Sequence, residues 1–151
     1  SSSGKAIRFN ETAVRSMGRN ARGVRGIKLG ESERLISLII PAEGYLLSAS
    51  QNGYGKRTPM QDFPAKGRGG QGVIAIQTSE RNGKMIGATQ VFDGDEVMLI
   101  SNSGTLVRIP TEQISVVGRN TQGVKLISLK EGELLNSVER IADRQEDQSK
   151  D

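Results

Sequence analysis

The sequence predicts an all-β fold assembled from three tandem repeats. The motif Gly-Arg-x-x-x-Gly-Val occurs three times, starting at Gly18, Gly67 and Gly118, with spacings of 49 and 51 residues. Fourteen residues before each copy stands another glycine, and an arginine follows that glycine four residues later. The motif and the preceding glycine keep the same spacing in all three copies, which indicates repeats of the length found in propeller-like and solenoid arrays. The preceding glycines are Gly4, Gly53 and Gly104, and the arginines are Arg8, Arg57 and Arg108.

Each repeat is expected to contain four short strands. The first two are apolar runs joined by a tight turn, at 45–49 and 54–58 in the second repeat and at 96–100 and 105–109 in the third. An Asn-Gly turn between such runs predicts a β-hairpin, because both turn positions favour positive φ. A third strand is expected after each glycine-rich loop, and a fourth after a polar turn. The third strands are predicted at 24–29, 73–77 and 124–129, and the fourth at 35–40, 84–91 and 134–141.

The repeats are assigned to residues 1–42, 43–93 and 94–143. The tail 144–151 contains no hydrophobic residue, and we expect it to be disordered. Repeat one starts at its hairpin turn, so its first strand is missing and a longer parent chain is expected. The run 35–40 is apolar in both phases, which is typical of a strand covered on both faces.

Composition argues against several functional classes. The chain has no cysteine and no histidine, which removes disulfides, thiolate metal sites and the commonest general base. No apolar run approaches the ~20 residues of a membrane helix. Gly67–Gly72 reads Gly-x-Gly-x-x-Gly, but a dinucleotide site needs a strand before it and a helix after it, whereas Pro64 precedes and a β-rich run follows. We therefore predict no catalytic residue, metal site or cofactor in this chain.

Two smaller groups of polar residues have structural explanations. Asp93, Asp95 and Glu96 surround Gly94, and a turn between strands accounts for the Asp-Gly-Asp run better than a metal site does. Tyr45 and Tyr54 stand at strand ends without a histidine or an acidic cluster beside them. Packing is the expected role of both tyrosines.

The charge of the chain changes along its length. Residues 1–42 carry eight Lys/Arg and three Asp/Glu, whereas residues 94–143 carry five and seven. Arginines that recur at equivalent positions of an array would form a regularly spaced basic track, which suits a phosphate backbone. The alternative to a DNA-binding track is that the glycines only shape turns and that the individual arginines are solvated surface charges. We expect a polyanion partner held mainly by the first two repeats.

Three stretches resemble the C-terminal domain of the A subunit of DNA gyrase, and the resemblance extends over residues 1 to about 142. They are Ser50–Thr58 (Ser-Gln-Asn-Gly-Tyr-Gly-Lys-Arg-Thr), Val117–Val124 (Val-Gly-Arg-Asn-Thr-Gln-Gly-Val) and Gly23–Gly30 (Gly-Val-Arg-Gly-Ile-Lys-Leu-Gly). The resemblance implies a six-bladed β-pinwheel, a propeller variant whose repeats exchange strands, and this chain would be its C-terminal half. It also implies wrapping of double-stranded DNA around the rim.

The same resemblance implies a bacterial, cytoplasmic setting and a place in an ATP-dependent type IIA topoisomerase that introduces negative supercoils. Catalytic residues, ATP and Mg would belong to other parts of that enzyme. The partners would be DNA, the remainder of gyrase A and the gyrase B protein, with no membrane. A half-domain could also associate with itself through open edges. The equivalent domain of topoisomerase IV is a near alternative, and a propeller-type protein-interaction module is an alternative from another class.

The family also has a basic box, Gln-Arg-Arg-Gly-Gly-Lys-Gly, in its first repeat. Residues 66–72 read Lys-Gly-Arg-Gly-Gly-Gln-Gly, which matches at Arg68, Gly69, Gly70 and Gly72 and departs at Lys66, Gly67 and Gln71. The box itself is therefore expected upstream, and complete wrapping is expected to need it. The predicted DNA-binding residues are Lys5, Arg8, Arg15, Arg19, Arg22, Arg25, Lys56, Arg57, Lys66, Arg68, Arg108, Arg119 and Lys125.

Overall fold

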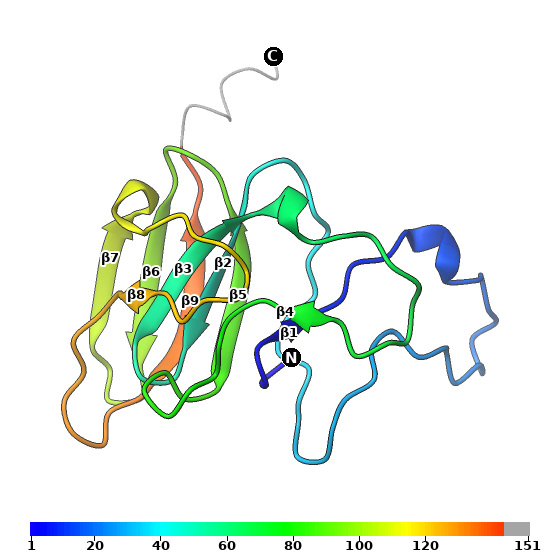
Figure 1. Cartoon of the computed structure of the whole chain (residues 1–151), viewed down its shortest axis with the longest axis horizontal. Helices are drawn as coiled ribbons and strands as arrows, with labels where there is room; N and C mark the ends of the chain where they lie inside the picture. Colours follow the sequence, from blue (N-terminus) through cyan, green and yellow to red (C-terminus); the bar gives the residue numbers. More distant parts are fainter. Residues whose placement is uncertain (144–151) are drawn as a thin grey trace.

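The computed structural model describes residues 1–143 as short antiparallel strands joined by turns and long loops (Figure 1). Helical structure in this range is limited to three one-turn 3-10 segments, and the all-β class predicted from the sequence is confirmed. The strands are β1 (Lys5–Ala6), β2 (Tyr45–Ser50), β3 (Tyr54–Pro59), β4 (Val73–Ile74), β5 (Met85–Val91), β6 (Glu96–Ser101), β7 (Leu106–Pro110), β8 (Val124–Lys125) and β9 (Leu135–Ile141). The 3-10 segments are η1 (Glu11–Ala13), η2 (Met60–Asp62) and η3 (Thr111–Gln113).

Neighbouring repeats exchange strands. The three sheets have the orders β1-β4, β5-β2-β3-β8 and β7-β6-β9. Strand β8 follows the glycine-rich loop of repeat three but pairs with β3 of repeat two, and β4 pairs with β1 of repeat one in the same way. Strands β5 and β9 instead pair with β2 and β6 of their own repeats. The exchange implied by the resemblance is therefore confirmed.

The main core lies where the two larger sheets pack against each other (Figure 1). Burial of its aliphatic side chains provides the main stabilisation of these repeats, at about 25 cal/mol per Å² of apolar area. Gly87 on β5 allows the sheets to come close, because a Cβ there would lie 2.7 Å from Cγ1 of Val138 on β9. The buried core residues are Leu47, Ala49, Val91, Val97, Leu99, Ile114, Ile127, Leu135 and Val138, and a smaller cluster contains Leu46, Met60, Phe63 and Ala75.

Repeat one departs from the predicted strand pattern. Residues 24–29 and 35–40 form no strand, so both predictions were wrong. In the other repeats the fourth strand pairs with the first strand of its own repeat, and residues 1–42 contain no such strand. The apolar run consequently stays open, with Leu38 and Ile40 each 91% exposed. Only part of it packs: Ile39 contacts the smaller cluster, and Ser37 Oγ donates to the Ala88 carbonyl at 2.8 Å.

Strands β4 and β8 are shorter than predicted for a different reason. The amides of Leu126 and Ile127 both donate to the Gly53 carbonyl, and those of Ala75 and Ile76 both donate to Gly4. After two strand residues, the backbone amides therefore donate to the turn of the preceding hairpin, and the regular strand pairing ends there. The predicted disorder of 144–151 falls outside the described residues.

Candidate nucleic-acid interface

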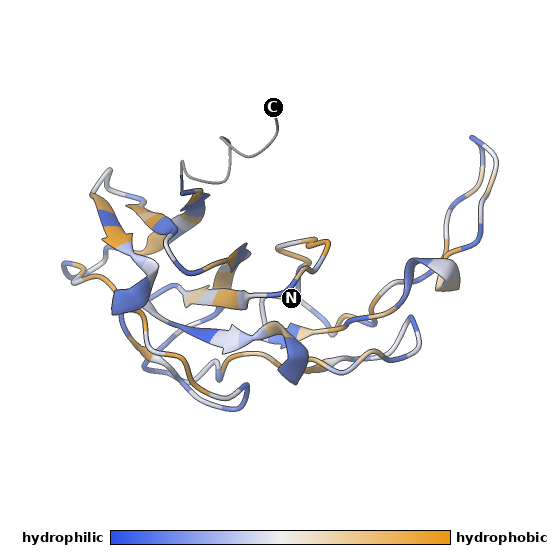
Figure 2. Ribbon diagram, turned by 90° about the horizontal axis from the view of Figure 1, so that it is seen from above, coloured by the Kyte–Doolittle hydropathy of each residue, from blue (hydrophilic) through white to orange (hydrophobic). Residues whose placement is uncertain are grey.

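A loop of repeat one concentrates exposed basic residues. Residues 14–29, here called the basic loop, contain five Lys/Arg and no Asp/Glu, and all five cationic side chains are exposed. The loop projects away from the two larger sheets (Figure 1), and hydropathy colouring shows mainly hydrophilic and neutral residues along it (Figure 2). The cations are Arg15, Arg19, Arg22, Arg25 and Lys28.

The base of the basic loop is hydrogen-bonded to the glycine-rich loop of repeat two. The Gly69 amide donates to the Gly26 carbonyl at 2.7 Å, and the Lys28 amide donates to the Gly70 carbonyl at 2.8 Å. Lys66 lies exposed on the same bracing loop, and its amide donates to Arg8. The tip of the basic loop is therefore free of the sheets while its base is fixed by backbone bonds.

The motif arginines of repeats two and three join neighbouring repeats. Arg68 Nη1 donates to the Arg25 carbonyl at 2.8 Å, and Arg119 Nη1 donates to the Ile74 carbonyl at 3.1 Å. Arg25 and Ile74 occupy equivalent positions, one residue after the motif valine. Arg68 Nε also donates to Ala13 at 3.0 Å. Recurrence at this position is thus explained by a repeated bond between repeats.

The second set of recurring arginines behaves similarly. Arg57 Nε donates to the Ile114 carbonyl at 2.8 Å, and Arg8 Nη1 donates to the equivalent carbonyl, of Phe63, at 3.3 Å. Arg57 is buried, and its guanidinium lies 4.8 Å from the Tyr45 ring centroid. Its assignment to the DNA-binding set is therefore corrected to a structural role. Arg108, the third of the set, is exposed and forms an ion pair with Glu96.

Lys56 requires the largest correction. It was predicted to bind DNA, but its side chain is completely buried. Its Nζ donates to the carbonyls of Gly118 (2.7 Å), Arg119 and Thr121 (3.2 Å) and to Thr121 Oγ1 (3.0 Å). Burial, with the nearby Arg119 charge, lowers the pKa of Lys56 to about 8. Lys56 thus holds the glycine-rich loop of repeat three.

A sequence signal for this burial did exist. The positions equivalent to Lys56 in repeats one and three are Ile7 and Val107. An apolar residue at the same point of two sister repeats indicates an inward-facing position. Comparison of the three repeats at this one position would have removed Lys56 from the predicted DNA-binding residues.

The second glycine of the motif is required by close packing. Gly72 and Gly123 have φ of +80° and +75°, and a Cβ on either would lie 2.4 Å from a carbonyl oxygen, of Ala6 and Gly55 respectively. Glycine is the residue that tolerates both the positive φ and the approach of a second backbone. The motif therefore specifies where one repeat lies on the preceding hairpin.

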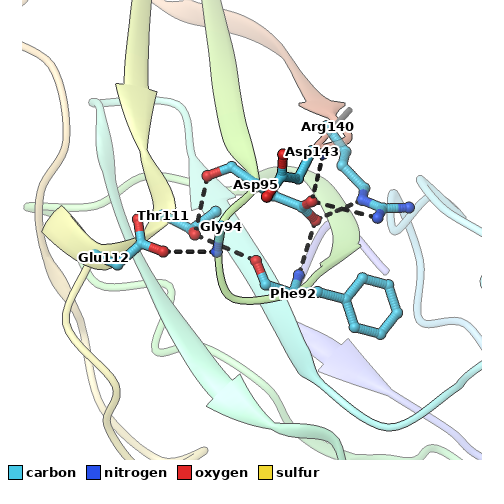
Figure 3. A network of polar contacts seen from close by, with 7 residues as sticks. All are labelled: Phe92, Gly94, Asp95, Thr111, Glu112, Arg140 and Asp143. Carbon is cyan, nitrogen blue, oxygen red and sulfur yellow. Dashed lines mark hydrogen bonds and ion pairs between the residues drawn. The ribbon is translucent and has the colours of Figure 1, made fainter. Parts of the chain in front are cut away.

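The acidic Asp-Gly-Asp run forms a turn that joins repeats two and three (Figure 3). The buried Asp95 carboxylate accepts hydrogen bonds from Arg140 Nε at 2.6 Å and from the amides of Phe92 and Asp143. Although burial raises the pKa of Asp95, these bonds outweigh it and lower the pKa below its ordinary value. The Gly94 amide donates to Glu112 at 2.6 Å, which ties the turn to η3.

Most of the predicted DNA-binding residues are exposed or half-buried, and many of them belong to repeat one. Lys28 was missed there, although it lies in the same run of cations. Within residues 1–143, no helix is long and apolar enough to cross a membrane, and no three acidic side chains are placed to hold a metal ion. The predicted residues that are exposed or half-buried are Lys5, Arg8, Arg15, Arg19, Arg22, Arg25, Lys66, Arg68, Arg108, Arg119 and Lys125.

A protein-family model, described as the DNA gyrase C-terminal domain, β-propeller, matches residues 1–42, 44–91 and 95–142. The chain belongs to this family. Among curated relatives of this gyrase-type domain, the DNA gyrase A protein of Pseudomonas aeruginosa is 58% identical over 142 residues, and that of Escherichia coli is 51% identical over 144. The alignments cover 93% and 95% of this chain but only 15% and 16% of those proteins.

Solved structures agree with the family assignment. A DNA gyrase A C-terminal domain superposes with a TM-score of 0.84 at 30% identity, covering 93% of this chain and 48% of that one. The C-terminal domain of DNA topoisomerase IV also gives 0.84, at 25% identity, covering 96% and 46%. The gyrase-type domain described here therefore corresponds to about half of each of these two solved domains.

Proposed function

We propose that this chain binds duplex DNA without sequence preference and bends it, as part of the DNA-wrapping domain of a gyrase A protein. The observation that carries the proposal is the basic loop, in which five exposed cations occur without an acidic residue. Each cation that neutralises a phosphate releases counterions, which favours binding at low salt. Exposed charges act over a Debye length of ~10 Å at moderate salt, so a local cluster matters more than the net charge of the chain.

Binding would be directed to the DNA backbone. The basic loop contains arginines and lysines but no helix or ribbon of the kind that enters a major groove. Contacts to phosphate fix position and carry no sequence information. The family assignment supports the same conclusion, and it favours gyrase over topoisomerase IV because the close curated relatives are gyrase A proteins.

Catalysis would belong to the rest of the parent enzyme. With that remainder and with gyrase B, in the bacterial cytoplasm, the domain would support wrapping and ATP-dependent negative supercoiling. Bending a 20–30 base-pair site by 40–90° costs on the order of 1–6 kcal/mol, which a long contact track must offset. This chain alone is therefore expected to bend DNA and to wrap it incompletely, so ligation of nicked plasmid in its presence should change the linking number less than a six-repeat domain does.

The direct test is fluorescence anisotropy with a 30-base-pair duplex at several salt concentrations. The wild-type chain should bind with an affinity that falls as salt rises, with a log–log slope of roughly −0.9 per phosphate neutralised. Triple charge reversal (Arg19→Glu, Arg22→Glu, Arg25→Glu) should abolish most of the binding. The matched control (Arg34→Glu, Lys84→Glu, Lys130→Glu) reverses three exposed cations elsewhere and should lose less.

Two results would contradict the proposal. Equal losses in the two triple variants, with both folded, would mean that the basic loop has no special role. A wild-type chain that binds no duplex DNA at low salt would favour the protein-interaction alternative instead.

A further inference from the structure

A second cluster of cations lies far from the basic loop in sequence and is organised by one aromatic ring. Tyr54, the first residue of β3, has the guanidinium carbon of Arg81 4.2 Å from its ring centroid and the Nζ of Lys125 6.0 Å from it. Tyr54 and Lys125 are direct cross-strand partners in the β3–β8 ladder. The negative face of an aromatic ring attracts cations, so the ring holds both charges beside repeat three.

Arg81 is held in place without being neutralised. Its Nε donates to Asn82 Oδ1 at 3.0 Å, and its Nη2 donates to the Gly123 carbonyl at 3.1 Å. Both acceptors are uncharged, and Arg81 and Lys125 remain exposed. No carboxylate of residues 1–143 forms an ion pair with either cation, although Glu80 precedes Arg81 in the chain. Within residues 1–143 the Nη1 of Arg81 makes no hydrogen bond, so this fixed guanidinium is suited to a phosphate oxygen.

Repeat equivalence relates this cluster to the basic loop. Lys125 occupies the position of Arg25, one residue after the motif valine. Tyr54 occupies the position of Lys5, which pairs with Ile74 as Tyr54 pairs with Lys125. Equivalent positions of an array recur along the same side of it. By repeat position, the cluster therefore corresponds to the part of repeat one that carries Arg25 of the basic loop.

We propose that Tyr54, Arg81 and Lys125 form a second phosphate-binding site for the backbone of duplex DNA, with the ring ordering the two cations. The inference rests on the proposed function and adds two residues, Tyr54 and Arg81, to those predicted from the sequence. Because cations approach the ring, it is not open for stacking on a base. The site therefore recognises backbone charge and does not favour single strands or particular sequences.

The experiment measures the salt dependence of binding by the whole chain to the same 30-base-pair duplex. Arg81→Ala and Lys125→Ala should each lower the magnitude of the log–log slope by about 0.9, the value for one lost phosphate contact. Lys84→Ala removes an exposed cation that has no ring contact, and it should leave the slope unchanged. Tyr54→Phe keeps the ring and should bind as wild type, whereas Tyr54→Leu should weaken binding several-fold.

Circular dichroism and thermal melting should show that the alanine variants and Tyr54→Phe stay folded, so the proposal remains testable if Tyr54→Leu unfolds. Slopes of Arg81→Ala and Lys125→Ala that equal the slope of Lys84→Ala would overturn the site while leaving the proposed function intact. A Tyr54→Phe variant as weak as Tyr54→Leu would overturn the role of the ring. Absence of any wild-type binding would overturn both proposals.

Discussion

The same motif occurs in two different environments at the two ends of this chain. Gly118–Val124 is held from several sides: Lys56 donates to its carbonyls, Arg119 bonds to repeat two, and Gly123 lies against the backbone of Gly55. In Gly18–Gly23 of the basic loop, the only hydrogen bond within the described chain runs from the Ala21 amide to the Gly18 carbonyl at 3.1 Å.

The difference in contacts between these two loops indicates the structural role of the motif. Where a hairpin of the preceding repeat lies beneath it, the motif forms a joint and its arginine bonds to a backbone carbonyl. Where no such hairpin is present in the chain, the same arginine is exposed. Since both loops carry the same Gly-Arg-Asn start and the same second glycine, the neighbouring repeat is what separates the bonded Arg119 from the exposed Arg19. The following predictions test this contrast, from the largest expected effect to the smallest.

The largest effect is expected from alanine at the second motif glycine. Gly123→Ala combines a positive φ with a clash against the Gly55 carbonyl, and it should destabilise the fold by about 2–5 kcal/mol. Gly23→Ala has a similar φ of +83° but open space around the added Cβ, so it should cost only about 1–2 kcal/mol. Urea unfolding measures both, and equal losses would contradict the idea that the hairpin beneath the loop makes the difference.

Substitutions at Lys56 and at Arg19 should also differ in their effect on stability. Lys56→Met leaves the carbonyls of Gly118 and Thr121 without their donor, which should destabilise the fold by about 1–3 kcal/mol. Arg19→Met in the open loop should change stability by less than about 0.5 kcal/mol. Denaturant midpoints for both variants, at one protein concentration, provide the comparison.

The pH dependence of the Lys56 contribution has a defined sign. The folded pKa is about 8, below the 10.5 of an unperturbed lysine, so the unfolded chain binds the extra proton between these values. Stability conferred by this group should therefore rise with pH across that window, by at most about 1.4 kcal/mol per pH unit. The difference in unfolding free energy between wild type and Lys56→Met, measured from pH 7 to 10.5, should show the rise. A flat difference would mean that Lys56 keeps its ordinary pKa.

Arginine variants should dissociate stability from DNA binding. Arg119→Ala removes the bond to Ile74 and should lower stability by about 0.5–1.5 kcal/mol with little change in the salt slope of DNA binding. Arg22→Ala should do the reverse, leaving stability unchanged and reducing the slope by about 0.9. Thermal melts and anisotropy titrations of the same two samples decide the matter, and parallel effects in both assays would remove the proposed distinction.

The smallest effects are expected from a contact that repeats one and three share, a glutamate that accepts hydrogen bonds from nearby hydroxyl groups. Hydrogen bonds from Ser1 and Ser3 lower the pKa of Glu33 to about 2, and bonds from Ser103 and Thr105 lower the pKa of Glu133 below its ordinary value. Both carboxylates should therefore contribute stability above pH ~4.5 that disappears as the pH falls through the folded pKa values. Acid titration of stability should become shallower in Glu33→Gln and, in the same direction, in Glu133→Gln. A change in only one variant would show that this contact, too, depends on the neighbouring repeat.

Much of the fold could be predicted from local patterns. The Asn52-Gly53 hairpin, the strand runs of repeats two and three and the glycine-rich loops follow from residues close together in sequence. Residues 35–40 were mispredicted because strand formation needs a partner, and an apolar run cannot report whether the partner lies in the same chain. In residues 14–29, five cations without a neighbouring acidic residue favour exposure to solvent, and these side chains are exposed, but the strand predicted at 24–29 does not form.

What the sequence by itself determined is the three-fold motif, the all-β class and the family, since these depend on residue types at regular spacing. What only the tertiary structure decided is the role of each recurrent cation. Arg68 and Arg119 bond to carbonyls more than forty residues away. Lys56 does not recur, and the sister repeats indicate its burial, but its carbonyl partners lie more than sixty residues away. The physical reason is that a backbone carbonyl carries no residue type: any residue can supply the acceptor, so the partner of a buried cation leaves no mark in the sequence until the chain folds.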